Sequence, residues 1–238
     1  MENMSTTQHI SHQFNAEMQN LRNHVMNMGG LVEQQILAAA EALQTQNAPA
    51  AEKVIRDDHK VNAMEVSIDE ECAQILARRQ PAASDLRMVV AVIKTITDLE
   101  RIGDEAEKIA SMAVHMSERD SSYHPRYAGV QHLSKHVSTM VHDALDAFAR
   151  LDVAAALNVL KSDEVVDAEY KAFMRQMITY MMEDPRTISE VLDIVWAARA
   201  MERIGDHAKN ICEYVIYLVK GKDIRHIDIE KVEKDIRP

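Results

Sequence analysis

The chain has 238 residues, with 27 Lys or Arg against 38 Asp or Glu, so its formal net charge is −11 with histidine neutral. This acidic balance argues against nucleic acid and anionic membranes as partners, because both select basic surfaces. Hydrophobic residues make up 47 % of the chain, which is enough to bury a core and excludes a wholly disordered protein.

Helical periodicity begins near the start of the chain, and no segment has the alternation and turn residues of a β-hairpin. Apolar residues recur at spacings of three and four from Phe14 to Leu43, which predicts a first long helix. A second helix is predicted over about residues 50–79, with Asn47 as its cap, and a third over about residues 82–118.

The second half repeats this order after residues 117–125, which carry no apolar stripe and are predicted to form a linker. A fourth helix is predicted on the apolar positions that end at Leu151, and a fifth from its cap Asp152 to about residue 182. A sixth is predicted to end at Gly221, because glycine readily adopts the left-handed turn that closes a helix. The charged tail that follows is expected to fray.

One pentapeptide occurs twice. Glu-Arg-Ile-Gly-Asp stands at residues 100–104 and at residues 202–206, an offset of 202 − 100 = 102. The preceding residues match at an offset of 105, in the pairs Leu43 and Phe148, Asn47 and Asp152, Val54 and Val159, Asp58 and Asp163, Val61 and Val166, and Asn62 and Asp167. We therefore predict an all-α fold of two tandem antiparallel three-helix bundles related by internal duplication, in residues 1–120 and 121–238.

Each copy of the pentapeptide places two carboxylates on the helix face opposite the apolar residues, and so outside the expected core. Like charges four residues apart repel by roughly 0.2–0.5 kcal/mol per pair, so a helix that keeps them twice invites a cation. The preceding helix of each half adds oxygen groups at the same spacing. The candidate metal ligands are Glu100, Asp104, Glu202, Asp206, Asn210, Asp58, Asn62, Asp163 and Asp167.

Carboxylate and amide oxygens without thiolates suit hard metal ions. We expect a surface-bound divalent or iron-type ion such as Mg, Mn, Zn or Fe, which the fold does not require. The alternative is that these acidic side chains form an ordinary solvated face. Gly103 and Gly205 each cost about 1 kcal/mol relative to Ala inside a helix, and either close helix packing or space beside the carboxylates would explain them.

The sequence offers no catalytic constellation. It has no Glu-x-x-His of ferritin-type di-iron bundles, no glycine-rich phosphate loop and no nucleophile elbow. Cys72 and Cys212 form no Cys-x-x-Cys pair, so neither a disulfide framework nor a zinc-thiolate site is expected. We expect no enzymatic activity. The alternative is a metal-storing or metal-dependent hydrolytic helical bundle that uses the same surface carboxylates.

No apolar run approaches the roughly 18 residues that a membrane-spanning helix needs. The polar start of the chain lacks the apolar segment of a secretion signal. We therefore expect a cytoplasmic protein without direct membrane insertion.

Two segments carry a family resemblance. Gln80-Pro-Ala-Ala-Ser-Asp-Leu-Arg87 with Asp98-Leu-Glu-Arg-Ile-Gly-Asp104, and Met201-Glu-Arg-Ile-Gly-Asp-His-Ala-Lys-Asn-Ile-Cys-Glu213, closely resemble the PhoU family, and the resemblance covers nearly the whole chain. It implies two tandem three-helix bundles, as the repeat does. It also implies metal clusters on the repeated acidic motif, which Asn210 extends by one turn in the second copy. Lys108 stands at that place in the first copy, so we expect a weaker or smaller site there, or none.

The resemblance further implies a function. Members of the family damp the phosphate-starvation response when phosphate is ample. They contact the sensor histidine kinase of that response and the ATPase subunit of the phosphate ABC transporter. We therefore expect an adaptor between these two partners that acts as a negative regulator of the response and a modulator of phosphate uptake. Family habit and the long apolar stripes favour a homodimer.

Overall fold

The computed structural model describes residues 2–81, 83–118, 128–227 and 229–236. Within these ranges the secondary structure is helical and contains no strand. The elements are α1 (Glu2–Thr45), α2 (Ala48–Asp57), α3 (His59–Arg79), α4 (Ala83–Ser117), α5 (Ala128–Arg150), α6 (Val153–Glu183), the 3-10 turn η1 (Pro185–Thr187), α7 (Ile188–Lys220) and α8 (Ile229–Ile236).

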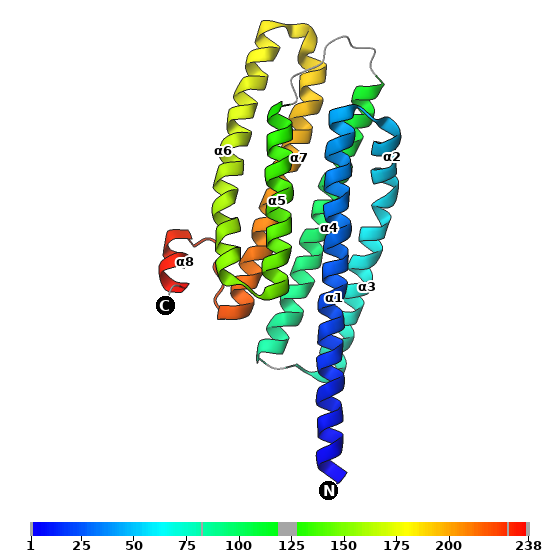
Figure 1. Ribbon diagram of the computed structural model, residues 1–238, viewed down its shortest axis with the longest axis vertical. Coiled ribbons are helices and arrows are strands. Elements are labelled where there is room, and N and C mark those ends of the chain that lie inside the picture. The colour runs from blue at the N-terminus through cyan, green and yellow to red at the C-terminus, as the bar shows by residue number, and fades with distance from the viewer. Residues whose placement is uncertain (1, 82, 119–127, 228, 237–238) are drawn as a thin grey trace.

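The long helices form two bundles that lie side by side along their length (Figure 1). The first bundle consists of α1, the α2–α3 arm and α4, and the second consists of α5, α6 and α7. α4 packs along α7 and α1 packs against α5, so these four helices join the bundles. The predicted all-α fold of two duplicated three-helix bundles is confirmed, whereas the expected boundary between residues 120 and 121 lies outside the described residues.

The two cores use equivalent positions of the repeat. Leu43 and Phe148, which the sequence paired at an offset of 105, are both fully buried. The three caps also form as expected: Asn47 accepts a hydrogen bond from the backbone of Ala50, Asp152 accepts two from the start of α6, and Gly221 ends α7 with a φ of 69°. No helix of the described part is both long and apolar enough to cross a membrane.

The predicted second helix is broken into α2 and α3 at Asp58. The interruption is slight, because Asp58 keeps right-handed helical dihedral angles (φ −59°, ψ −34°) and its carbonyl oxygen accepts hydrogen bonds from the amides of Val61 and Asn62. The Asp58 side chain is turned inward and hydrogen-bonded to other side chains, and a short polar residue of this kind competes with regular helix geometry. The break therefore coincides with a buried carboxylate.

The expectation that the charged tail frays is wrong for its described part. Ile224 and Val232 are buried, and α8 packs against α6, where Lys161 pairs with Glu233 at 2.8 Å. Apolar contacts hold this charged segment on the bundle, from Ile224 and Val232 and from the partly buried Ile227 and Ile229. Of the predicted linker, residues 117 and 118 complete the end of α4, and the remainder lies outside the described residues.

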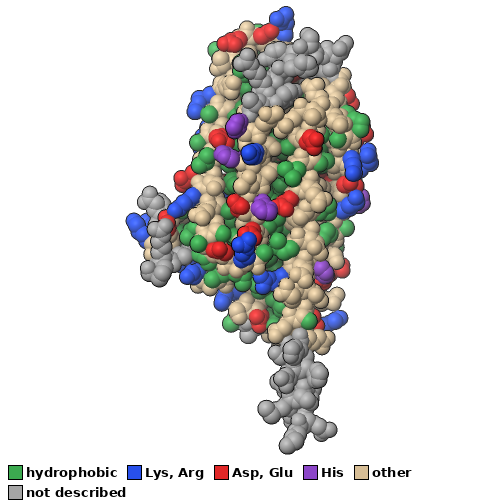
Figure 2. All heavy atoms as spheres, in the orientation of Figure 1, with side chains coloured by type: hydrophobic (Ala, Val, Ile, Leu, Met, Phe, Trp, Pro, Cys, Tyr) green, Lys and Arg blue, Asp and Glu red, His purple; other side chains and the backbone are tan. Residues whose placement is uncertain are grey.

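Figure 2 shows acidic, basic and histidine side chains scattered over one face of the molecule, with hydrophobic side chains between them. The acid excess of the chain is therefore not gathered into a single patch on this face.

Candidate functional site

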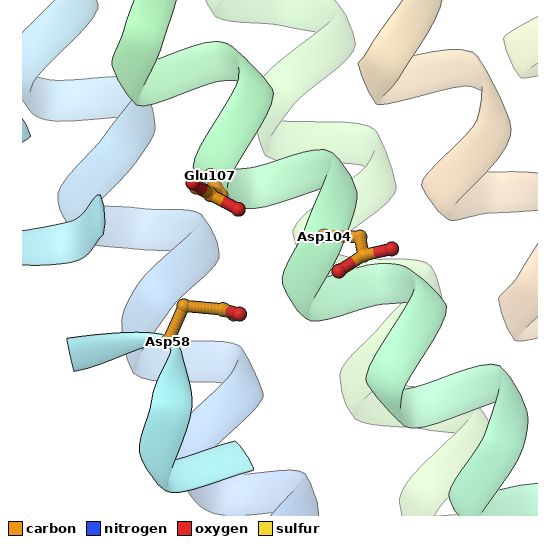
Figure 3. Close-up of side chains that lie close together, drawn as sticks. All are labelled: Asp58, Asp104 and Glu107. Carbon is orange, nitrogen blue, oxygen red and sulfur yellow. The ribbon is translucent and has the colours of Figure 1, made fainter. Parts of the chain in front are cut away.

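Three carboxylates from two segments of the first bundle meet in one cluster. Asp58 comes from the α2–α3 junction, and Asp104 and Glu107 come from adjacent turns of α4 (Figure 3). One oxygen of each lies within 4.8 Å of the others. In the ranges that the structure describes, this is the one set of three acidic, histidine or cysteine side chains close enough to share a metal ion. We call Asp58, Asp104 and Glu107 the first cluster.

Asp58 is held by neighbouring amides. It is 5 % exposed and accepts hydrogen bonds from Gln35 Nε2 at 3.3 Å and from Asn62 Nδ2 at 3.1 Å. Gln35 is itself 4 % exposed, and its Oε1 atom is buried without a hydrogen-bond partner. An amide oxygen in this position costs free energy unless something donates to it or binds it.

Gly103 makes room for these oxygens beside α4. A Cβ atom at this position would lie 3.1 Å from Asp58 Oδ1 and 3.3 Å from Gln35 Oε1. Both distances are tighter than ordinary van der Waals contacts, so glycine allows the carboxylate and the amide to approach the helix backbone. Of the two reasons that the sequence suggests for Gly103, the space beside the carboxylates is the one that this geometry favours.

The first cluster carries more negative charge than its surroundings neutralise. Burial and the charges of Asp58 and Asp104 raise the pKa of Glu107 above its ordinary value. Burial and the charge of Asp104 raise the pKa of Glu100 in the same way. Arg101 lies at the edge, 3.5 Å from Glu100 and 3.6 Å from Asp104. The oxygen donors, the unpartnered amide oxygen and the raised pKa values together suit a hard cation.

The second bundle places a lysine against its equivalent carboxylate. Asp163 is 6 % exposed, and Lys209 Nζ lies 2.7 Å from its Oδ2 atom. Glu202 pairs with Arg199 at 2.7 Å, and burial followed by the charge of Asp206 raises the pKa of Glu202. Desolvation and the charge of Asp163 raise the pKa of Asp206. We call Asp163, Glu202 and Asp206 the second cluster. Two cations of the chain lie against it, Lys209 on Asp163 and Arg199 on Glu202.

Several predicted site residues lie elsewhere. Asn210 donates to Asp98 Oδ1 at 3.0 Å, so its amide takes part in the contact between α4 and α7. Asp167 pairs with Lys171 at 3.3 Å. The expectation that the pentapeptide carboxylates stand outside the core fits the exposed Asp206, whereas the Glu202 side chain is only 12 % exposed. Asp58 and Asp163, on the preceding helices, are buried.

Lys108, which the sequence places at the extension of the first motif, pairs with a residue outside the first cluster. Its Nζ atom binds Glu105 Oε1 at 2.9 Å. Sequence reasoning instead missed Glu107, Gln35 and Lys209. Glu107 could have been found, because it lies three residues after Asp104 and so on the same helix face. Gln35 could not, because it comes from α1 and carries no part of the repeated motif.

A row of buried polar contacts joins the bundles between α4 and α7. Asp98 is met by His207 Nδ1 at 2.7 Å in addition to Asn210, and Glu105, which is almost fully buried, is met by Arg203 at 2.8 Å. Charges buried at this depth need partners, and each acid here has two, since Lys108 also binds Glu105. These contacts fix how α4 and α7 lie against each other.

Comparison with known proteins finds one family model that matches both halves. The model described as PhoU domain matches residues 25–113 and 130–215. Over 233 residues the chain is 53 % identical to the phosphate-specific transport system accessory protein PhoU homolog of Pseudomonas aeruginosa, which covers 98 % of this chain and 96 % of that protein. It is 48 % identical over 235 residues to the phosphate-specific transport system accessory protein PhoU of Escherichia coli, with coverage of 98 % and 96 %.

Two solved structures are similar to the whole fold. The crystal structure of PhoU from Pseudomonas aeruginosa matches with a TM-score of 0.85 at 54 % identity and covers 88 % of this chain and 100 % of that chain. The phosphate transport system regulatory protein PhoU from Streptococcus pneumoniae matches with a TM-score of 0.82 at 28 % identity, with coverage of 88 % and 98 %.

Proposed function

The chain belongs to the PhoU family, and from this premise we propose that it regulates phosphate transport as an adaptor. In this proposal it is a cytoplasmic, homodimeric, non-enzymatic negative regulator of the phosphate-starvation response. Its partners are the sensor histidine kinase of that response and the ATPase subunit of the phosphate ABC transporter. It restrains uptake when phosphate is ample.

The observation that carries the proposal is similarity over the full length. Relatives named as accessory proteins of phosphate-specific transport match 98 % of this chain at about half identity, and the match covers 96 % of their own length. An adaptor can bias a two-state partner only by binding one state more tightly than the other. We therefore expect the protein to bind one state of the kinase preferentially and to shift it toward its phosphatase activity.

A deletion strain tests this role. Loss of the gene should raise expression of phosphate-starvation genes in high phosphate, and the wild-type gene should restore repression. Unchanged expression in the deletion strain would contradict the regulatory role. Rescue is also to be tested with a double variant, Asp104→Asn with Asp206→Asn. Full rescue by that variant would separate the adaptor role from the carboxylates.

We further propose that the first cluster holds a hard divalent ion, with Asp58, Asp104, Glu107 and Gln35 as ligands. The unpartnered Gln35 oxygen supports this proposal, because an ion bound to the carboxylates would also satisfy it. Carboxylate and amide oxygens favour Mg or Mn over Zn, and they also accept iron. Mn²⁺ binding by the purified protein, lost in Asp104→Asn, is the expected result, and equal binding by both proteins would contradict it.

The alternative, a metal-dependent hydrolytic or metal-storing bundle, predicts a different result. Turnover of phosphoesters by the purified protein, abolished by Glu202→Gln, would favour an enzyme over an adaptor. Uptake of many ions per chain would favour storage.

A further inference from the structure

The two glycines of the repeated pentapeptide have equivalent surroundings, which allows the clusters to be compared atom by atom. A Cβ atom at Gly103 would meet Asp58, Gln35 and Val61, and one at Gly205 would meet Val166, Met140 and Asp163. Each of these residues in the first bundle has its counterpart 105 positions later (163 − 58, 140 − 35 and 166 − 61). The clusters can therefore be compared residue by residue, although Asp58 stands at the break between α2 and α3 and Asp163 lies within the continuous helix α6.

The decisive difference lies three residues after the last carboxylate of the motif. Glu107 stands there in the first bundle and Lys209 in the second, at the motif offset of 102 (209 − 107). Glu107 adds a third carboxylate to the first cluster, whereas Lys209 Nζ lies 2.7 Å from Asp163 Oδ2. This contact places the amine of Lys209 on the carboxylate that is equivalent to Asp58.

A second difference lies on the first helix of each bundle, which is α1 in the first and α5 in the second. Gln35 brings a buried oxygen without a partner to the first cluster, while Met140 brings a methyl group to the same place in the second. A hard cation gains a ligand from the amide oxygen and none from the methyl group. The second cluster has thus lost both a carboxylate and an amide ligand.

A third difference is a second built-in cation. Arg199 pairs with Glu202 at 2.7 Å and lies over the ring of Tyr170, 5.9 Å from its centroid. Its counterpart 102 residues earlier is Thr97, which hydrogen-bonds its own helix backbone. Arg199 therefore adds a cation at a position where the first bundle has none, while Glu100, the counterpart of Glu202, is met by Arg101 at 3.5 Å.

We infer that the Lys209 ammonium serves as a tethered replacement for the metal ion, so that the second cluster excludes divalent ions and the first alone binds one. An ammonium hydrogen-bonded to Asp163 occupies the space where a metal would bind that carboxylate, and it repels any cation that approaches. The inference rests on the proposed metal site of the first bundle. It attributes to Lys209 the difference between the two bundles, in which the first cluster binds a divalent ion and the second does not.

The test is Lys209→Glu, which places a carboxylate at the position of the second bundle that is equivalent to Glu107. The matched control is Lys220→Glu, which makes the same charge change on the same exposed side of the chain's last long helix, about 16 Å farther along α7. Mn²⁺ bound per chain is measured by equilibrium dialysis with elemental analysis. Wild type and Lys220→Glu should bind about one ion, and Lys209→Glu about two. Adding Asp163→Asn to Lys209→Glu should return the number to about one.

The outcomes separate the two proposals. Loss of the single wild-type ion in Asp104→Asn supports the first site. A wild type that binds no Mn²⁺ overturns that site but leaves Lys209 to be judged by the gain in its variant. A second wild-type ion that is lost in Asp206→Asn, or a folded Lys209→Glu without a gain, overturns the role of Lys209. If Lys209→Glu does not fold, Lys209→Gln decides in its place, because it also removes the ammonium and must gain Mn²⁺ binding.

Discussion

The two bundles share a packing plan and differ in charge. In the first, three carboxylates gather around Gly103, and in the second, a lysine and an arginine neutralise the acids around Gly205. The apolar positions of the repeat are kept, as in the fully buried Leu43 and Phe148. The comparison teaches that an identical pentapeptide does not make an identical site, because the chemistry is set by side chains that the pentapeptide does not contain.

Large-to-small substitutions in the two cores should have the greatest effect on stability, and they test whether the bundles pack in the same way. Phe148→Ala should lower the free energy of unfolding by about 3–5 kcal/mol, because it leaves a large cavity at a fully buried position. Leu43→Ala, at the equivalent position of the first bundle, should cost about 2–5 kcal/mol. Urea unfolding followed by circular dichroism measures both. A loss below about 1 kcal/mol for either variant would show that the repeat-equivalent cores are not equivalent in energy.

Lys209→Gln should be the most damaging of the polar changes. It leaves the buried carboxylate of Asp163 without its cation, which should cost about 1–3 kcal/mol, since Lys209 is itself one-third exposed. The control is Lys171→Gln, which breaks an exposed pair with Asp167 and should cost at most about 1 kcal/mol. Thermal unfolding of both variants gives the comparison. Equal losses would mean that Asp163 does not depend on Lys209.

The two glycines should respond differently to alanine. Gly205→Ala meets ordinary contacts of 3.6 Å or more and should stabilise the protein by up to about 1 kcal/mol through helix propensity. Gly103→Ala pushes against Asp58 and the Gln35 oxygen, so the gain should be smaller or reversed. Mn²⁺ binding should weaken in Gly103→Ala and stay unchanged in Gly205→Ala. Equal stabilisation with unchanged binding would separate Gly103 from the cluster.

The smallest effect is a change of stability with pH. Glu107→Gln removes one of the three charges of the metal-free first cluster and should stabilise it by roughly 0.2–0.5 kcal/mol at pH 7. Because the pKa of Glu107 is raised in the folded protein, this group binds its proton more tightly in the folded than in the unfolded state, and its unfavourable contribution to stability shrinks as the pH falls. The advantage of the variant should therefore vanish as the pH approaches 4.5, the ordinary value for the group. The free energy of unfolding of both proteins is measured across this pH range. A constant advantage of the variant would contradict the raised pKa of Glu107 in the cluster.

Much of the fold could be predicted from local patterns. The spacing of apolar residues and the caps Asn47 and Asp152 depend on contacts within a few residues, which the sequence displays directly. The break at Asp58 and the docking of α8 could not be predicted, because each depends on partners far away in the sequence.

The candidate site was predicted only in part, and the reason is geometric. Asp58 and Asp104 were found because both copies of the repeat carry acids there. The sequence comparison used the residue four positions after the last carboxylate of the motif, which is Lys108 in the first copy and Asn210 in the second. These residues pair with Glu105 and Asp98 and not with the clusters. The residue three positions after that carboxylate turns toward the cluster, as Lys209 does.

The contacts between α4 and α7 have a mechanical consequence. Sliding one helix along the other by a single turn, about 5.4 Å, would separate the buried Asp98 from His207 and Asn210, and the buried Glu105 from Arg203. We therefore expect the pair of bundles to behave as one stiff rod and not as a hinge. A partner that binds one end of this rod would then reorient the other end as well. Binding at two distant surfaces can therefore be coupled without any bending of the molecule.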